Sequence, residues 1–198
     1  MSDLHQLELV TAPAVLPISL VEVKAQLRIE HADEDTYLNR LIDVGVDMVD
    51  AKGVLGQPMI SQTWALWMPA TPPYEVPLPL SPVQSVSAVK YYDANGDLQT
   101  DTLSNYDVFG RSMNKTIKPK TGFAWPVAQQ RSDAINIEFV AGFGDAASDV
   151  PDTIRHAMLM LISFWYENRE NELVGTIGKT LPFGFVDLLN IHRERWYG

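Results

Sequence analysis

The spacing of hydrophobic residues changes twice along this chain, from a helical period to strand alternation and back again. In the segment 34–52, four apolar side chains share one helical face: Leu38, Leu41, Ile42 and Val49. From Ile60 to Met68 the pattern has a period of two, with the large apolar residues Trp64, Leu66 and Met68 on one side, which is typical of a strand. Helical spacing returns after Pro151. The chain is therefore expected to run from helices through strands to helices.

Local signals set the expected helices. Ser19 and Glu22 have the spacing of a capping box, which predicts a short helix over 19–28. Acidic residues open a second helix over 34–52, and Gly53 is a plausible stop. Pro151 suits the first turn of a third helix over 151–169, which is apolar on nearly all sides. An amphipathic pattern predicts a fourth helix over 183–196.

The expected strands are confined to residues 59–141. Six of the thirteen prolines fall between Pro69 and Pro82, so that stretch is expected to be a loop or an extended edge. The Asn95-Gly96 pair predicts a hairpin turn. Further strands are expected at 83–92, 106–109, 115–118 and 135–139.

This order predicts an α+β fold: a helical bundle formed by both ends of the chain, with a β-rich insertion in the middle. The helical part would comprise residues 1–58 and 142–198, and the insertion residues 59–141. A length of 198 residues fits one domain with a sizeable insertion.

Composition narrows the function classes. The formal net charge is −10, and lysine and arginine form no cluster, so tight binding of DNA is not expected. Cysteine is absent, which excludes disulfides and thiol chemistry. The longest strongly apolar run, 157–166, is far shorter than the roughly 20 residues that span a bilayer, so no membrane association is expected.

Motifs for catalysis are weak. Residues 142–147, GFGDAA, fit the dinucleotide fingerprint G-x-G-x-x-[GA], but Pro151 places the following helix too late to meet a phosphate. We interpret the motif as a glycine-rich turn. No histidine has metal-ligand spacing, and residues 175–180 lack the first glycine of a phosphate loop. The prediction is no enzyme, no cofactor and no metal.

Two surfaces are candidates for binding. Asp43, Asp47 and Asp50 make an acidic stripe on the second helix, which is either a solvated face or a surface that faces DNA without holding it. The last helix has one apolar face that either covers the core or docks on a partner. Its residues, with the basic and aromatic end that follows, are Phe185, Leu188, Leu189, His192, Arg193, Arg195 and Trp196.

Residues 140–170, VAGFGDAASDVPDTIRHAMLMLISFWYENRE, resemble the signature region of the head–tail connector (adaptor) proteins of long-tailed bacteriophages. The family pattern is a strand, a Gly-x-Gly-Asp turn, a Val-Pro start and a helix that closes on Trp-Tyr-Glu-Asn-Arg-Glu. The N-terminal helices, the segment LPLSPVQSVSAVKYYDANGD and the closing segment LPFGFVDLLNIHRERW are similar to other parts of that family.

The resemblance implies a structural subunit of a phage, prophage or gene transfer agent particle. It would form a ring, usually twelvefold, beneath the portal protein and extend the DNA channel toward the tail. Assembly would take place in the host cytoplasm, and the partners would be the portal, further copies of the chain and a stopper or tail-completion protein. No catalytic residues come with the family. The alternatives are that the chain is itself a stopper or tail-completion protein, or a small enzyme or ligand-binding module using a cleft between helical and β parts.

Overall fold

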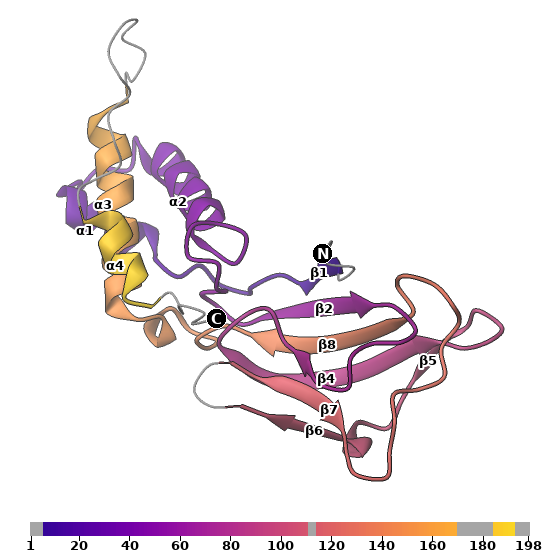
Figure 1. The fold of residues 1–198 in the computed structure, drawn as a ribbon. Coiled ribbons are helices and arrows are strands. Elements are labelled where there is room, and N and C mark those ends of the chain that lie inside the picture. The colour runs from indigo at the N-terminus through magenta and orange to yellow at the C-terminus, as the bar shows by residue number, and fades with distance from the viewer. Residues whose placement is uncertain (1–5, 111–113, 170–183, 193–198) are drawn as a thin grey trace, which may run out of the picture. The chain divides into compact units, whose positions relative to one another are not determined.

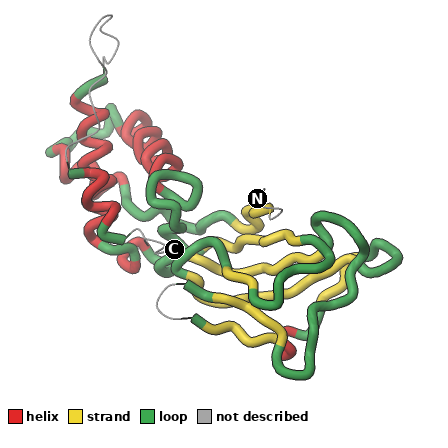
Figure 2. Tube along the Cα trace, in the orientation of Figure 1, coloured by secondary structure: helices red, strands yellow, loops and turns green. Residues whose placement is uncertain are grey.

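The computed structural model describes residues 6–110, 114–169 and 184–192. The chain divides into two compact units. The β unit comprises Met1–Ala14 and Ser61–Gly142, and the helical unit comprises Val15–Ile60 and Phe143–Gly198. Figure 2 shows the α-helices gathered in the helical unit.

Two antiparallel sheets build the β unit (Figure 1). The first has five strands in the order β1-β2-β8-β4-β5, and the second has three in the order β3-β7-β6. The strands are β1 (Gln6–Thr11), β2 (Gln62–Met68), β3 (Val76–Pro77), β4 (Val83–Tyr92), β5 (Leu98–Thr100), β6 (Tyr106–Phe109), β7 (Thr116–Pro119) and β8 (Ile135–Ala141). A short 3-10 turn, Leu103–Asn105, precedes β6.

Alternation along β2 and β8 buries one face of the larger sheet. Trp64 lies opposite Phe139 and Leu66 opposite Ile137, and all four side chains are buried. Cross-strand pairs of this kind are the main stabilising contacts of a sheet. The alternation that predicted strands at 60–68 and 135–139 is thereby confirmed.

The hairpin between β4 and β5 is also confirmed. Gly96 has a φ of 87°, the left-handed region that favours glycine. The Asp93 carboxylate accepts hydrogen bonds from the backbone N–H groups of Asn95 and Asp97, at 2.9 and 3.0 Å. These bonds hold the turn that the Asn-Gly pair predicts.

The helical unit contains α1 (Leu20–Leu27), α2 (Asp35–Val49), α3 (Asp152–Glu167) and α4 (Phe185–Asn190), with a 3-10 turn at Ala147–Asp149. The capping box of Ser19 and Glu22 is present, as predicted. Asp152 follows Pro151 as the first residue of α3. The predicted helices at 19–28, 34–52 and 151–169 are thus confirmed to within a few residues at each end, while residues 193–196 of the fourth lie outside the described part.

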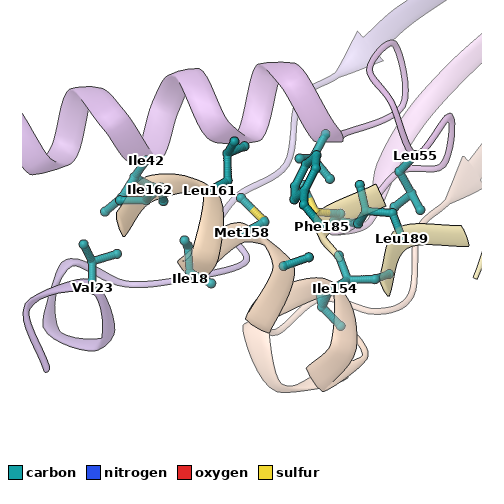
Figure 3. Packing of buried hydrophobic residues seen from close by; sticks show 14 of the residues in the cluster. Ile18, Val23, Ile42, Leu55, Ile154, Met158, Leu161, Ile162, Phe185 and Leu189 are labelled. Atoms are coloured by element: carbon teal, nitrogen blue, oxygen red, sulfur yellow. The ribbon is translucent and has the colours of Figure 1, made fainter. Parts of the chain in front are cut away.

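A single hydrophobic cluster fills the helical unit (Figure 3). α3 contacts each of the other three helices, and its fully buried residues are Ile154, Ala157, Met158, Leu161 and Ile162. α2 contributes the face that its sequence predicts: Leu38, Leu41, Ile42 and Val49. Each large apolar side chain buried in this way stabilises the fold by about 1.5–3 kcal/mol.

The predicted fold class is wrong. The described residues form a mixed α and β fold with four α-helices and two antiparallel sheets. A helical bundle made from the two ends of the chain is not found among them. The first described residues form β1, which pairs with β2 at the edge of the larger sheet. The restriction of strands to 59–141 fails for the same reason. β1 is held by backbone hydrogen bonds to a strand more than fifty residues away, and local periodicity does not report such pairing.

Candidate docking and channel surfaces

The apolar face of α4 lies in the core of the helical unit. Phe185 and Leu189 are both 0% exposed and stand among the buried side chains of the cluster (Figure 3). Leu188 is partly buried against the same cluster. In this conformation the predicted docking face is therefore covered by the chain's own residues.

His192 fastens the end of α4. Its Nε2 lies 2.5 Å from the Thr153 hydroxyl oxygen at the start of α3. Its backbone carbonyl accepts a 3.0 Å hydrogen bond from the Gln57 side-chain amide. The ring also packs edge-on against Phe143, with centroids 6.3 Å apart. Arg193, Arg195 and Trp196, the remaining predicted docking residues, lie outside the described residues.

α4 presents a second face outward. Val186 is 39% exposed and Ile191 is 64% exposed, and Asp187 and Asn190 are also exposed. A partner could contact this face without displacing the helix from the core. The helical spacing of apolar residues predicts only the inner face. Val186 and Ile191, the outward apolar residues, fall outside that spacing.

The acidic stripe on α2 is divided by the structure. Asp43 and Asp47 are exposed. Asp50 is half-buried, and its Oδ1 accepts a 2.7 Å hydrogen bond from the backbone N–H of Met59. Asp50 thus holds the loop that follows α2, and only the first two carboxylates are presented to a ligand or to solvent.

A polar cluster joins the start of α2 to the end of α3. The Glu34 carboxylate accepts hydrogen bonds from the Tyr166 hydroxyl and, at 2.6 Å, from the Arg169 guanidinium. The Arg169 guanidinium also lies 4.3 Å from the ring centre of Tyr166 and 4.5 Å from that of Tyr37. The Tyr166 hydroxyl, followed by Arg169, holds the pKa of Glu34 below its ordinary value.

A second polar cluster joins α1 to α3. The Arg155 guanidinium pairs with Glu22, which also accepts hydrogen bonds from Ser19. Arg155 further donates to the Asp152 carboxylate, at 3.3 Å. Burial raises the pKa of Glu22, but the hydrogen bonds from Ser19 and the charge of Arg155 outweigh it and leave that pKa lowered. Sequence reasoning found the Ser19–Glu22 box but missed both long-range arginine pairs, since their partners are more than 130 positions apart.

The glycine-rich segment is a turn, as predicted. A Cβ on Gly144 would lie 2.3 Å from the Asp149 carboxylate, so only glycine fits there. That carboxylate accepts a 2.9 Å hydrogen bond from the backbone N–H of Ala146. The turn is therefore closed by the chain itself.

Within the described ranges, no group of three or more acidic or histidine side chains could hold a metal ion. No helix among these residues is long and apolar enough to cross a membrane.

Comparison with solved structures gives matches over the whole fold. The chain resembles a chain in a structure described as the neck of an empty gene transfer agent (GTA) particle computed with C6 symmetry, with a TM-score of 0.76 and 22% identity over 98% of both chains. A chain in the neck of a native GTA particle computed with C12 symmetry gives 0.68 and 23%, and one in the virion of a native GTA particle gives 0.65 and 22%, again over 98% of both. No curated protein matches the sequence.

The family comparison is more specific. The model for phage gp6-like head-tail connector proteins matches residues 17–121, just over half of the chain. The match includes the predicted opening helices and middle strands, and the structural matches extend over the signature segment 140–170 as well. The chain belongs to the phage gp6-like head–tail connector family, and its role is that of a structural head–tail connector.

Proposed function

We propose that the chain is the subunit of a ring that lies beneath the portal and continues the DNA channel toward the tail of a phage or gene transfer agent particle. The observation that carries the proposal is family membership over residues 17–121, combined with a fold that resembles neck proteins of GTA particles over 98% of its length. The symmetry given for one of those necks, C12, supports twelve copies.

The net charge of the chain supports a role as part of a DNA channel. A net charge of −10 repels the phosphate backbone, so DNA can pass without being retained. Asp43 and Asp47 are exposed neighbours on one face of α2, and we propose that this face lines the channel. Asp50 is assigned instead to the loop after α2, because its carboxylate holds the Met59 backbone.

The C-terminal segment is proposed to dock on the portal. Docking through Phe185 and Leu189 would require α4 to leave the core, at a cost of about 1.5–3 kcal/mol for each side chain before new contacts form. Docking through Val186 and Ile191 costs nothing of this kind, since both are exposed already. We therefore propose the outward face of α4 as the first contact, with Arg193, Arg195 and Trp196 following it along the chain.

The proposed role is mechanical and needs no chemistry from the chain. The polar clusters of α3 support this assignment, because each holds helices together and each ionised group has a partner of opposite charge. On the tail side, we propose a stopper or tail-completion protein as the next partner.

Electron microscopy of the chain mixed with the portal protein of the same genome tests the proposal. A twelvefold ring attached to the narrow end of the portal is expected. Density that attaches only below another ring would instead make the chain a stopper or tail-completion protein. Failure to associate with the portal or with any ring would refute the connector assignment to this position.

A further inference from the structure

We propose that the ring is closed through its sheets: the free edge of β1 in one copy pairs with the free edge of β6 in the next copy. This inference rests on the proposed ring. It names the two surfaces that such a ring needs and that the family match does not identify.

A closed ring of identical subunits requires two different surfaces on each subunit, because a surface that pairs with itself stops at a dimer. β1 and β6 meet this requirement. They are edge strands of different sheets within the same β unit. Figure 1 shows them at opposite ends of that unit. One subunit can therefore offer β1 to one neighbour and β6 to the other.

β1 is the longest of the described edges, and the one irregularity in its pairing with β2 lies between Leu9 and Thr11, at the end of the strand. It has six residues, five of them exposed, and includes Leu9 at 38% and Val10 at 49% exposure. It contains no proline or lysine, the residues that usually block pairing at an edge. Among the described residues, no backbone hydrogen bond reaches its outer side. An edge of this kind is a template for another strand.

The other edges differ in how well they could accept β1. β3 has two residues and ends in Pro77, and β5 has three residues. β6 has four residues, and its exposed side chains include Val108 at 42% and Phe109 at 40%. Of the three other described edges, β6 is therefore the longest partner for the six-residue β1.

Charge also pairs β1 with β6. Glu8 is the single charged residue of β1, and a pocket of about 340 Å³ beside it is lined by Gln6, Leu7, Glu8, Trp67, Tyr92 and Asp133. The Asp133 carboxylate already pairs with Arg131, whose guanidinium lies 4.0 Å from the Tyr92 ring centre. Glu8, which accepts a 2.9 Å hydrogen bond from Trp67, is therefore the carboxylate that we assign to the ammonium group of a lysine.

The hairpin of β6 and β7 supplies such lysines. Three lysines lie on or beside β7: Lys115, Lys118 and Lys120. The paired strand β6 carries one carboxylate, that of Asp107, so the two strands are locally basic in a chain whose net charge is −10. Lys118 already pairs with Glu75 at 2.9 Å, and Lys120 lies 4.0 Å from Asp107. Lys115, which is half-buried just before β7, is the lysine that we place toward the pocket.

The chain has no cysteine, so introduced cysteines report contacts without background. Leu9→Cys or Val10→Cys would be combined with Asp107→Cys or Val108→Cys, giving four double variants. Neighbouring strand residues point to opposite faces, so the four combinations sample both sides of a paired edge. Each full-length variant would be assembled with the portal, oxidised, and run on a denaturing gel without reductant.

At least one double variant is expected to give a ladder of covalent multimers, while each single variant stays monomeric. Leu9→Cys with Leu98→Cys is the matched control, because Leu98 is an exposed leucine on the unused edge of β5. If rings form but the ladder appears only with Leu98→Cys, or with no pair, the edge assignment is wrong and the ring proposal stands. If microscopy of the reduced samples shows no rings at all, the proposed function itself fails.

Discussion

His192 Nε2 lies 2.5 Å from the hydroxyl oxygen of Thr153 and so ties the end of α4 to the first turn of α3. The same short helix buries Phe185 and Leu189 completely. α4 is thus joined to the helical unit both by apolar burial and by a polar contact at its end. The first contribution should be the larger, because two buried side chains contribute several kcal/mol and one hydrogen bond about 1 kcal/mol.

Thr153→Val removes that polar contact and keeps the shape of the side chain. We expect the free energy of unfolding to fall by about 0.5–1.5 kcal/mol, since the imidazole loses a partner in a partly buried place. Urea denaturation followed by circular dichroism measures the change. Thr36→Val, at an exposed position of α2, is the control and should have little effect. Equal losses in the two variants would mean that the contact with His192 contributes nothing.

Leu161→Ala tests the position of α3 at the centre of the helical core. Leu161 is 0% exposed, so its truncation should lower the free energy of unfolding by about 2–5 kcal/mol. Val21→Ala on α1 is the control, because Val21 is 76% exposed and should change stability by less than about 0.5 kcal/mol. A thermal melt that is the same for Leu161→Ala and for the unmodified chain would contradict the packing in Figure 3.

Much of the fold follows from local sequence. The elements that local sequence does not predict share one cause, which is dependence on contacts far apart in the chain. Ser19 and Glu22 cap α1 through contacts three residues apart, and Asp93 and Gly96 build their turn within five. Such short-range devices are readable in one sequence. β1 is different, because its place is decided by an edge of β2 far along the chain.

The binding surfaces stay predictions, because no partner is present to test them. The periodicity of α4 identified an apolar face, but it could not tell a core face from a docking face, and the structure buries it. The stripe on α2 joined three aspartates by helical spacing alone. The Asp50 carboxylate also accepts a hydrogen bond from the Met59 backbone, a contact with a loop that helical spacing does not describe.

Glu34→Gln should change how stability depends on pH. The hydrogen bond from Tyr166, and then that from Arg169, lower the pKa of Glu34 below its ordinary value near 4.5. A carboxyl group with a lowered pKa in the folded state contributes stability that is complete above its unfolded pKa and is lost as the pH falls through the folded value. The unmodified chain should therefore exceed the variant in stability near pH 7, and the difference should shrink below about pH 4.5.

Urea denaturation at several pH values between 3 and 7 measures this difference. Glu30→Gln, which removes a carboxylate at an exposed position four residues away, is the matched control. A Glu34→Gln difference that stays constant across the range would show that the charge of Glu34 is not stabilised in the folded chain.

The acidic face of α2 predicts a response to charge reversal. Asp43→Lys with Asp47→Lys turns two exposed carboxylates into amines, which attract the phosphate backbone. The unmodified chain should bind duplex DNA more weakly than about 1 µM at physiological salt in a filter assay, while particles assembled with the double variant should release their DNA more slowly. Asp97→Lys with Asp145→Lys reverses the same number of exposed charges elsewhere. If both double variants slow DNA release equally, the proposal that α2 lines the channel is wrong.

A portal-binding assay distinguishes between the inner and the outward face of α4 as the docking surface. Val186→Asp with Ile191→Asp places charges on the outward face, where both residues are exposed, so the chain should keep its thermal stability and lose affinity for the portal in a pull-down. Val21→Asp, with 76% exposure on α1, is the control and should bind normally. Normal binding by the α4 variant would contradict docking through the outward face.

Deletion of residues 181–198 tests whether the C-terminal segment is needed for portal binding and for the fold of the helical unit. Loss of Phe185 and Leu189 uncovers part of the core, so the truncated chain should unfold at a lower temperature but keep α1, α2 and α3, which the Glu22–Arg155 and Glu34–Arg169 pairs still join. It should no longer bind the portal. If the truncated chain binds the portal as well as the full chain does, the connector uses a surface outside the C-terminal segment. If it loses all helical circular dichroism, α4 is required for the core itself, and its release during docking is excluded because the other helices would unfold with it.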